Sequence, residues 1–335
     1  MSQDQILLGH GDGGRLTRRL IEEVFVKAFS NPALAPLADS ALVKLGGSRL
    51  AFTTDSYVVQ PVVFPGGDIG KLAVFGTAND LAVMGAKPVY LSCAFILEEG
   101  LELPLLKKIA ASMKYSAEKA GVKLVTGDTK VVERGSADRI FITTAGIGEL
   151  LDWPSMGKKI KPGDEILISG TIGDHGIAIL CARGELKFSL PVESDCNQVW
   201  PLVSALHRAK IKVKWMRDPT RGGVASALNE LVERRAFGIR IYEDRIPLNP
   251  AVDSACEVLG LDPLYLANEG KLIGIVEKGQ GARAREILRK SAWGKDAEIL
   301  GEIISEPKGR VITRTGIGGT RVLSMLAGAP LPRIC

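Results

Sequence analysis

The sequence has no long apolar run. A membrane-spanning helix needs roughly 20 consecutive apolar residues, and no segment of the 335-residue chain approaches that length. The chain starts with MSQDQILLGHGDGG, whereas a secretory signal peptide starts with basic residues followed by an apolar region. A membrane protein and a secreted protein are therefore both disfavoured, and a cytoplasmic location is expected.

Histidine is scarce, and the cysteines are widely spaced. The three histidines and five cysteines show neither the close spacing of zinc ligands nor that of a disulfide framework. A zinc site and a disulfide-stabilised fold are therefore not expected. Four cysteines are predicted to be small buried apolar residues, namely Cys93, Cys181, Cys196 and Cys256. The fifth, Cys335, differs from them because it is the last residue.

Aromatic residues make up only 5% of the chain. Basic residues outnumber acidic ones by 43 to 38, a formal net charge of +5, and they are scattered along the sequence. Nucleic-acid-binding proteins instead gather basic residues into a stripe, often with interleaved aromatic side chains. The pattern therefore favours a solvated basic surface over a nucleic-acid partner.

Strand-like and helix-like segments alternate along the chain. The first half predicts strands over 49–59, 88–99, 122–132 and 138–150, with helices over 69–86 and 104–121. A segment rich in turn residues, 152–165, precedes a second mixed set, and no pattern is visible from Arg310 onward. We expect an α+β fold with an N-terminal domain over 1–150, a C-terminal α+β domain over 151–323 and a flexible tail over 324–335.

Four aspartates stand beside small or turn-forming residues at the ends of predicted elements. They occur in TTDSYV, ANDLAVMGA, TGDTKVV and RDPTRGG, as Asp55, Asp80, Asp128 and Asp218. Any one of them could cap a helix or stabilise a turn. Three lie in otherwise apolar segments, where an unpaired carboxylate is costly. Together they predict a magnesium site, because magnesium binds oxygen ligands and bridges phosphates.

The opening GHGDGG runs into an amphipathic helix. Glycines let backbone amides approach phosphate, and a helix N-terminus favours negative charge. The order of residues is not that of a Walker A loop. A phosphate-binding loop and a mobile N-terminal loop both fit this stretch.

The sequence finishes in PLPRIC. Pro330 and Pro332 exclude an internal helix and favour an extended arm. A prenylation signal needs three residues after the cysteine, so Cys335 does not form one. An exposed thiolate is strongly nucleophilic, and the terminal thiol is therefore expected to be a reagent.

Taken in order, the motifs GDGG, TTDSYVVQPVVFPGGDIGKLAVFGTANDLAVMGAKP, VTGDTKVV, PGDEILISGTIGDHGIAIL, RDPTRGGVASALNEL, NEGKLIGIV and PRIC resemble the HypE family of hydrogenase maturation factors. The resemblance covers essentially the whole chain. The middle motifs are shared with the wider aminoimidazole ribonucleotide synthetase superfamily, and the PRIC end singles out HypE. In the related selenophosphate synthetases a reactive residue lies in the N-terminal loop, whereas the first cysteine here is Cys93, in a predicted strand.

The resemblance implies a two-domain α+β fold of the aminoimidazole ribonucleotide synthetase type. It implies a homodimer formed through the N-terminal domains, with ATP and magnesium near the subunit interface. The magnesium ligands would be the four aspartates named above. The nucleotide contacts would come from the matching motifs, as Gly11, Asp12, Gly13, Asn79, Gly127 and Thr129.

The resemblance also implies a carbamoyl dehydratase activity. The carbamoyltransferase HypF would carbamoylate the thiol that matches Cys335, and ATP would drive dehydration of this S-carboxamide to a thiocyanate. A HypC–HypD complex would accept the cyanide for the iron of a [NiFe] hydrogenase. Two protons must leave the amide nitrogen, and the resemblance points to Glu269 in NEGK and Lys130 in GDTK as bases. Glu269 could instead cap the turn at Gly270, and Lys130 could hold a phosphate.

Two other functions remain open from the sequence alone. A small-molecule synthetase or kinase of the same superfamily would be indifferent to loss of Cys335. A catalytically silent scaffold would bind nucleotide and present its tail to partners without hydrolysing ATP. The tail disfavours the first alternative, and the set of four aspartates disfavours the second.

Overall fold

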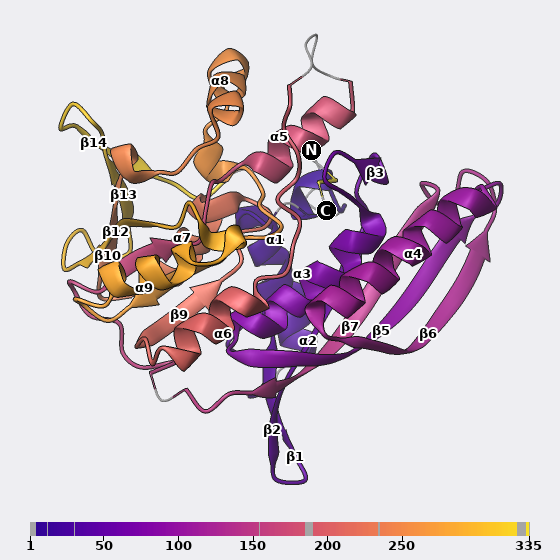
Figure 1. The fold of residues 1–335 in the computed structure, drawn as a ribbon, viewed down its shortest axis with the longest axis horizontal. Coiled ribbons are helices and arrows are strands. Elements are labelled where there is room, and N and C mark those ends of the chain that lie inside the picture. The colour runs from indigo at the N-terminus through magenta and orange to yellow at the C-terminus, as the bar shows by residue number, and fades with distance from the viewer. Residues whose placement is uncertain are drawn as a thin grey trace.

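The computed structural model describes residues 5–11, 13–29, 31–153, 155–184, 190–233, 235–326 and 333–334. Two mixed β-sheets, each with helices packed on it, form the body of the protein (Figure 1). The first sheet uses strands up to Leu150, and the second begins at Glu165. The expected α+β fold is thus confirmed. Within the described residues, no helix is long and apolar enough to cross a membrane.

The first sheet has the strand order β1-β2-β7-β5-β6. Only the β5–β6 pair is parallel, and the other neighbours are antiparallel. Helices α3 and α4 lie against this sheet (Figure 1). The bounds are β1 Ala41–Leu45, β2 Ser48–Tyr57, α3 Ile69–Val83, β5 Ala86–Glu98, α4 Leu103–Ala120, β6 Lys123–Val132 and β7 Ile140–Leu150.

The second sheet has the order β14-β13-β10-β12-β8-β11-β9, with α6 and α9 packed together near it (Figure 1). Its strands are β8 Glu165–Ile168, β9 Val213–Arg217, β10 Gly238–Tyr242, β11 Ile273–Val276, β12 Glu298–Ile304, β13 Val311–Arg314 and β14 Thr320–Leu323. Its helices are α5 Asp174–Ala182, α6 Trp200–Arg208, α7 Gly223–Val232, α8 Pro250–Leu259 and α9 Gly281–Arg289.

Short elements complete the chain. Before the first sheet lie a 3-10 turn, helix α1, a π-helical segment and helix α2, over Leu8–Gly11, Arg15–Leu20, Ile21–Val26 and Lys27–Phe29. Strands β3 and β4, over Val63–Phe64 and Gly67–Asp68, form a small hairpin. Further 3-10 turns occupy Glu243–Arg245, Pro263–Tyr265 and Ala292–Gly294.

Helix α3 lies at the centre of the molecule. The Asp68 carboxylate caps it by accepting hydrogen bonds from the amides of Gly70 and Lys71, at 2.8 and 2.9 Å. Most of its side chains are buried, because it contacts the first sheet, α4, α6 and β9. Its apolar sequence therefore matches a helix that is covered on every side.

The structure corrects two sequence-based expectations. The regular secondary structure does not end at Arg310, because β13 and β14 form an antiparallel hairpin at the edge of the second sheet. Each strand has only four residues, too few for a periodicity to be visible. Among the cysteines, Cys93, Cys196 and Cys256 are buried as expected, whereas Cys181 is partly exposed at the end of α5.

Candidate functional site

Three of the four predicted magnesium ligands meet in one cleft. Asp55 comes from β2, Asp80 from the last turn of α3, and Asp218 directly follows β9. The cleft is lined by Asp55, Ser56, Tyr57, Gly76, Asp80, Asp218, Thr220, Arg221 and Glu269. Both sheets therefore contribute to it, and α3 joins their contributions.

A fourth carboxylate in this cluster was not found by sequence reasoning. Oxygen atoms of Asp39, Asp80 and Asp218 all lie within 4.8 Å of one another. Asp39 precedes β1 and forms an ion pair with Arg217, at 3.0 Å. In the sequence Asp39 stands beside serine and alanine, so it has the appearance of an ordinary turn residue.

Hydroxyl groups orient the carboxylates. The Thr53 hydroxyl donates to Asp80 Oδ2 at 2.8 Å, and the Tyr57 hydroxyl donates to Asp55 Oδ2 at 3.2 Å. Tyr57 is itself within 3.3 Å of the Thr77 hydroxyl, on the inner face of α3. These contacts hold the acidic side chains toward the cleft, since a buried carboxylate gains most from hydrogen bonds of defined geometry.

The carboxylates repel one another. Burial, together with the charges of Asp55 and Asp218, raises the pKa of Asp80 well above its ordinary value. Burial and the charge of Asp39 raise the pKa of Asp218 to about 8. Burial also raises the pKa of Asp39, against the opposing effect of Arg217. Clustered buried carboxylates with raised pKa values suit a divalent cation, which would supply the missing positive charge.

Glu269 borders the same cleft and is held through its backbone. Its amide donates to Asp195 Oδ1 at 2.9 Å, and its carbonyl accepts from the Asn79 side chain at 3.3 Å. The side chain is 3% exposed, and its buried Oε1 has no hydrogen-bond partner among the described residues. Burial and the charge of Asp195 raise the pKa of Glu269 well above its ordinary value. A buried, unpartnered carboxyl is suited to exchange protons.

Asn79 is buried behind the cleft rather than at its surface. Its side-chain amide donates to the carbonyls of Asn197 and Glu269, at 2.9 and 3.3 Å. Its side-chain oxygen accepts from the Val199 amide at 2.8 Å. Both hydrogens of the side-chain amide thus form hydrogen bonds that join α3 to loops of the second half of the chain. A nucleotide contact by Asn79 stays a prediction.

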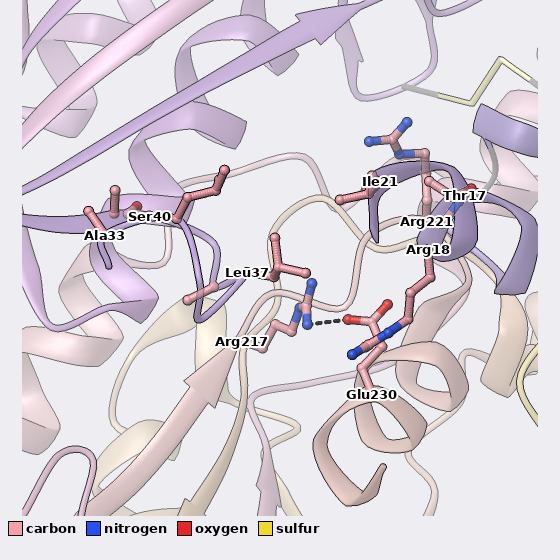
Figure 2. Close-up of a pocket in the computed structure, with 13 residues that line it drawn as sticks. Thr17, Arg18, Ile21, Ala33, Leu37, Ser40, Arg217, Arg221 and Glu230 are labelled. Carbon is pink, nitrogen blue, oxygen red and sulfur yellow. Dashed lines mark hydrogen bonds and ion pairs between the residues drawn. The ribbon is translucent and has the colours of Figure 1, made fainter. Parts of the chain in front are cut away.

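A larger cavity of about 350 Å³ lies beside the carboxylate cleft. It is lined by residues of α1, the π-helical segment, the 33–41 segment, β9 and α7, and Figure 2 shows the ion pair between Arg217 and Glu230, two of the lining residues. Arg221 lines both the cavity and the cleft. Apolar side chains such as Ile21 and Leu37 alternate with these charged groups, a lining typical of small-molecule sites.

The glycine-rich N-terminal loop lies on Arg221. The Arg221 guanidinium donates to the Gly11 carbonyl at 3.0 Å. Gly13 has a φ of +75°, and a Cβ there would lie 3.1 Å from the Arg221 carbonyl, so this position favours glycine. The predicted loop therefore reaches the edge of the site, although Asp12 lies outside the described residues.

The remaining predicted residues lie away from the cleft. Gly127, Asp128, Thr129 and Lys130 are exposed on β6, at the edge of the first sheet. Asp128 Oδ2 is 2.8 Å from Lys130 Nζ, and this contact lowers the pKa of Asp128. Asp128 does not join the other three aspartates within one chain.

Two residues near the end of the chain are held against the body. The Arg333 guanidinium donates to the Val58 carbonyl at 3.3 Å and to the Gln60 side chain at 3.1 Å, and it forms an ion pair with Asp138. Ile334 is 5% exposed and belongs to the apolar cluster that contains Cys196 and Ala267. Cys335 itself lies outside the described residues.

The metal-free protein is expected to lose stability as the pH rises toward 8. The pKa of Asp218 is about 8 in the folded chain and 3.8 ordinarily, so between these values the folded chain keeps a proton that the unfolded chain has released. Stability then falls by up to about 1.4 kcal/mol per pH unit for one such proton. Thermal melts in EDTA from about pH 5 to about pH 8 should show a smaller fall for Asp218→Asn than for the wild type.

Asp253→Asn, at an exposed position on α8, is the control for this experiment and should follow the wild-type curve. Parallel curves for all three proteins would contradict a protonated Asp218 in the metal-free state.

Two domain-family models and a full-length relative match this chain. Residues 37–150 match the model for the N-terminal domain of AIR synthase related proteins, and residues 161–314 match the model for their C-terminal domain. The carbamoyl dehydratase HypE of Rhodobacter capsulatus is 49% identical over 339 residues, which covers 100% of this chain and 99% of the relative.

Solved structures agree with the sequence matches. A crystal structure of a HypE–HypF complex contains a chain with 49% identity and a TM-score of 0.86, over 92% of this chain and 99% of that one. A crystal structure of HypE in complex with ATP gives 46% identity and a TM-score of 0.82, over 99% of this chain and 100% of that one. The sequence identity extends over the full length, both domain models match, and the fold is the same. This chain therefore belongs to the HypE family of AIR synthase related proteins.

Proposed function

We propose that this protein is a carbamoyl dehydratase that uses ATP to convert an S-carboxamide on Cys335 into a thiocyanate. The observation that carries the proposal is the burial of Ile334, the residue before Cys335, in the cluster that contains Ala267. Ala267 is two residues from Glu269, which borders the carboxylate cleft. The residue before the thiol is therefore packed in the same apolar cluster as a sequence neighbour of the group suited to accept a proton.

ATP is the co-substrate, and its binding is recorded for the HypE relative solved with ATP. We assign the nucleoside to the cavity of about 350 Å³ and the phosphates to the adjoining cleft, because Arg221 lines both. The glycine-rich loop rests on this arginine through Gly11, and its backbone would face the phosphates.

Magnesium fits the carboxylate cluster of this chain. Asp39, Asp80 and Asp218 would hold it, with Asp55 beside them. Bound there, magnesium would neutralise phosphate charge and stabilise the charge that develops in transfer. Burial and mutual repulsion raise the pKa values of these carboxyl groups, and a divalent cation held among them would offset that repulsion.

The reaction must remove one oxygen and two protons from the carboxamide. An amide oxygen is a poor leaving group, and transfer of the γ-phosphoryl group to it makes phosphate the leaving group. Both N–H protons are lost as the carbon–nitrogen triple bond forms, and the products are thiocyanate, ADP and phosphate. We assign Glu269 as one base, because its buried carboxyl has an oxygen free of partners among the described residues and a raised pKa.

We propose that the protein acts as a homodimer through the open face of the first sheet. Phe52, Ile147 and Tyr90 form a row across β2, β7 and β5 and are 46%, 40% and 46% exposed. A row of large apolar side chains in solvent is typical of an interface. In the strand register Asp128 pairs with Ala94 and Lys130 with Ile96, on the same face as Tyr90. Asp128 and Lys130 would therefore serve the cleft of the other subunit.

Ile147→Glu is expected to convert the protein into a monomer and to lower dehydration by at least about tenfold, since a charge in an apolar interface costs several kcal/mol. Light scattering after size exclusion measures the mass, and intact mass spectrometry follows the reaction. Val258→Glu, at an exposed position on α8, is the matched control. A dimeric and fully active Ile147→Glu protein would overturn the assigned interface.

Two partners follow from the reaction. The thiol must first receive a carbamoyl group, and HypF is the proposed donor, because a HypE relative forms a crystallised complex with HypF. The thiocyanate must then give up its cyanide. We propose a HypC–HypD complex as the acceptor, on the way to the iron of a [NiFe] hydrogenase.

Intact mass spectrometry tests the proposed function. The purified protein is incubated with HypF, carbamoyl phosphate and ATP, followed by more ATP. We expect a carbamoyl adduct that then loses one water, with neither species present in Cys335→Ala. Cys181→Ala, which removes a different thiol that is partly exposed, should react like the wild type. An adduct that persists without loss of water, or that forms on Cys335→Ala, would refute the proposal.

A further inference from the structure

We infer that His175 is a positioning residue for the reaction, because it binds the backbone carbonyl of Ile334, the residue immediately before the one that carries the reacting group. This inference rests on the proposed function. The motif that contains His175 suggests no such role in the sequence, where the histidine precedes an apolar helical stretch. The contact joins residues 159 positions apart.

His175 lies in the first turn of α5 and is fully buried. Its Nε2 is 2.8 Å from the Ile334 carbonyl oxygen, and its Nδ1 is 2.8 Å from the Ser194 hydroxyl. The imidazole and the Phe64 ring form a T-shaped pair, with 5.5 Å between ring centroids. Both nitrogens and the ring are therefore held by specific partners.

The partners determine the tautomer. A carbonyl oxygen only accepts, so Nε2 must carry the hydrogen, and in the neutral ring Nδ1 then accepts from the Ser194 hydroxyl. The Ser194 oxygen in turn accepts from the Cys196 amide at 3.1 Å. Burial lowers the pKa of His175, although Asp195 acts in the opposite direction. A neutral ring satisfies every one of these hydrogen bonds.

The tail is held at two successive carbonyls. His175 binds that of Ile334, and the Arg183 guanidinium donates to that of Arg333 at 2.7 Å. The Ile334 side chain is buried in the adjoining apolar cluster. The tail is thus held through the carbonyl of Ile334, the residue immediately before the one that carries the reacting group. Holding this neighbour in advance lowers the entropic barrier of a reaction on the tail.

The two steps proposed for Cys335 make opposite demands on this contact. Dehydration needs the tail docked against the body of the protein, whereas HypF must reach the thiol on a tail that has been released. The His175 bond to Ile334 is made in the docked state and broken in the other. Its loss should therefore slow dehydration without slowing carbamoylation.

The test separates the two rates. His175→Phe keeps a ring of similar size but no donor, and we expect dehydration of the preformed carboxamide to fall about 10- to 100-fold, the scale of a small misplacement. Carbamoylation by HypF should be unchanged or faster. Alkylation of Cys335 by iodoacetamide, followed by peptide mass mapping, should also be faster. His175→Gln, whose side-chain amide can still donate to the carbonyl, should recover part of the dehydration rate.

Ser194→Ala provides a second route if His175→Phe does not fold, because it keeps the ring and removes the hydroxyl that holds its Nδ1. It should slow dehydration in the same direction. His207→Phe is the matched control, since His207 also forms a T-shaped pair with an aromatic ring, that of Trp153, and contacts a backbone carbonyl.

Each outcome has a distinct meaning. If wild-type protein dehydrates its carboxamide and folded His175→Phe or Ser194→Ala does so at the same rate, the inference about His175 is wrong while the proposed function stands. If both steps slow equally, His175 has only a structural role. If wild-type protein forms no thiocyanate at all, the proposed function itself fails.

Discussion

Asp80→Asn should lower the ATP-dependent dehydration rate about a thousandfold and at the same time stabilise the metal-free protein. Asp80 shares the cluster with Asp39 and Asp218, so removing its charge removes both a magnesium ligand and a source of repulsion. Loss of one group that stabilises charge in transfer costs about 10²- to 10³-fold or more. The relief of repulsion should raise the melting temperature in EDTA, because burial and neighbouring charges already oppose ionisation of Asp80.

Isothermal titration with ATP at fixed magnesium, together with melts in EDTA, measures both effects. The exposed Asp253→Asn serves as control, and it should alter neither. Retention of magnesium-dependent ATP binding in Asp80→Asn would count against the metal assignment. A lower melting temperature would instead show that Asp80 stabilises the fold.

Glu269→Gln should stop the reaction after carbamoylation. The glutamine keeps the shape of the side chain but cannot take a proton, and loss of a general base lowers rates by about 10²- to 10⁴-fold. The backbone contacts to Asp195 and Asn79 do not involve the carboxyl group, so the fold and ATP binding should persist. Intact mass spectrometry should show the carboxamide accumulating with little loss of water.

Lys130→Met tests the second proposed base. Lys130 lies on exposed β6 rather than in the cleft of its own chain, so an effect of Lys130→Met on dehydration should require the dimer. Glu257→Gln, exposed on α8, should behave as wild type. Rapid dehydration by Glu269→Gln would exclude Glu269 as the base and direct the search to Lys130.

The sequence predicts the parts of the site that are continuous in the chain. Buried helix α3 and the strand that carries Asp55 follow from local apolar periodicity, and Asp55 and Asp80 stand out because an acidic residue in an apolar segment needs a reason. Asp218 stands out through the turn-forming residues of RDPTRGG beside it. Helix α4 is equally clear, since Gly121 ends it in the left-handed conformation, with φ of +69°.

Long-range contacts were beyond sequence reasoning. Asp39 matters only because folding brings it to Asp80, and His175 matters only because it meets Ile334. Neither has a neighbour in the sequence that signals its role. The separation of Asp128 from the other aspartates depends on strand order, which places β6 at the far edge of the sheet from β1. Alternation within a strand does not reveal that order.

The bonds of Asn79 have a mechanical consequence. Asn79, in the first half, is bonded to Asn197, Val199 and Glu269 of the second, and Ala82 and Val83 share an apolar cluster with Leu202 and Leu272. Two halves joined in this way resist hinge bending, because opening would break a packed core. We therefore expect nucleotide exchange to proceed by displacement of the N-terminal segment that contacts Arg221, while the two halves keep their relative position.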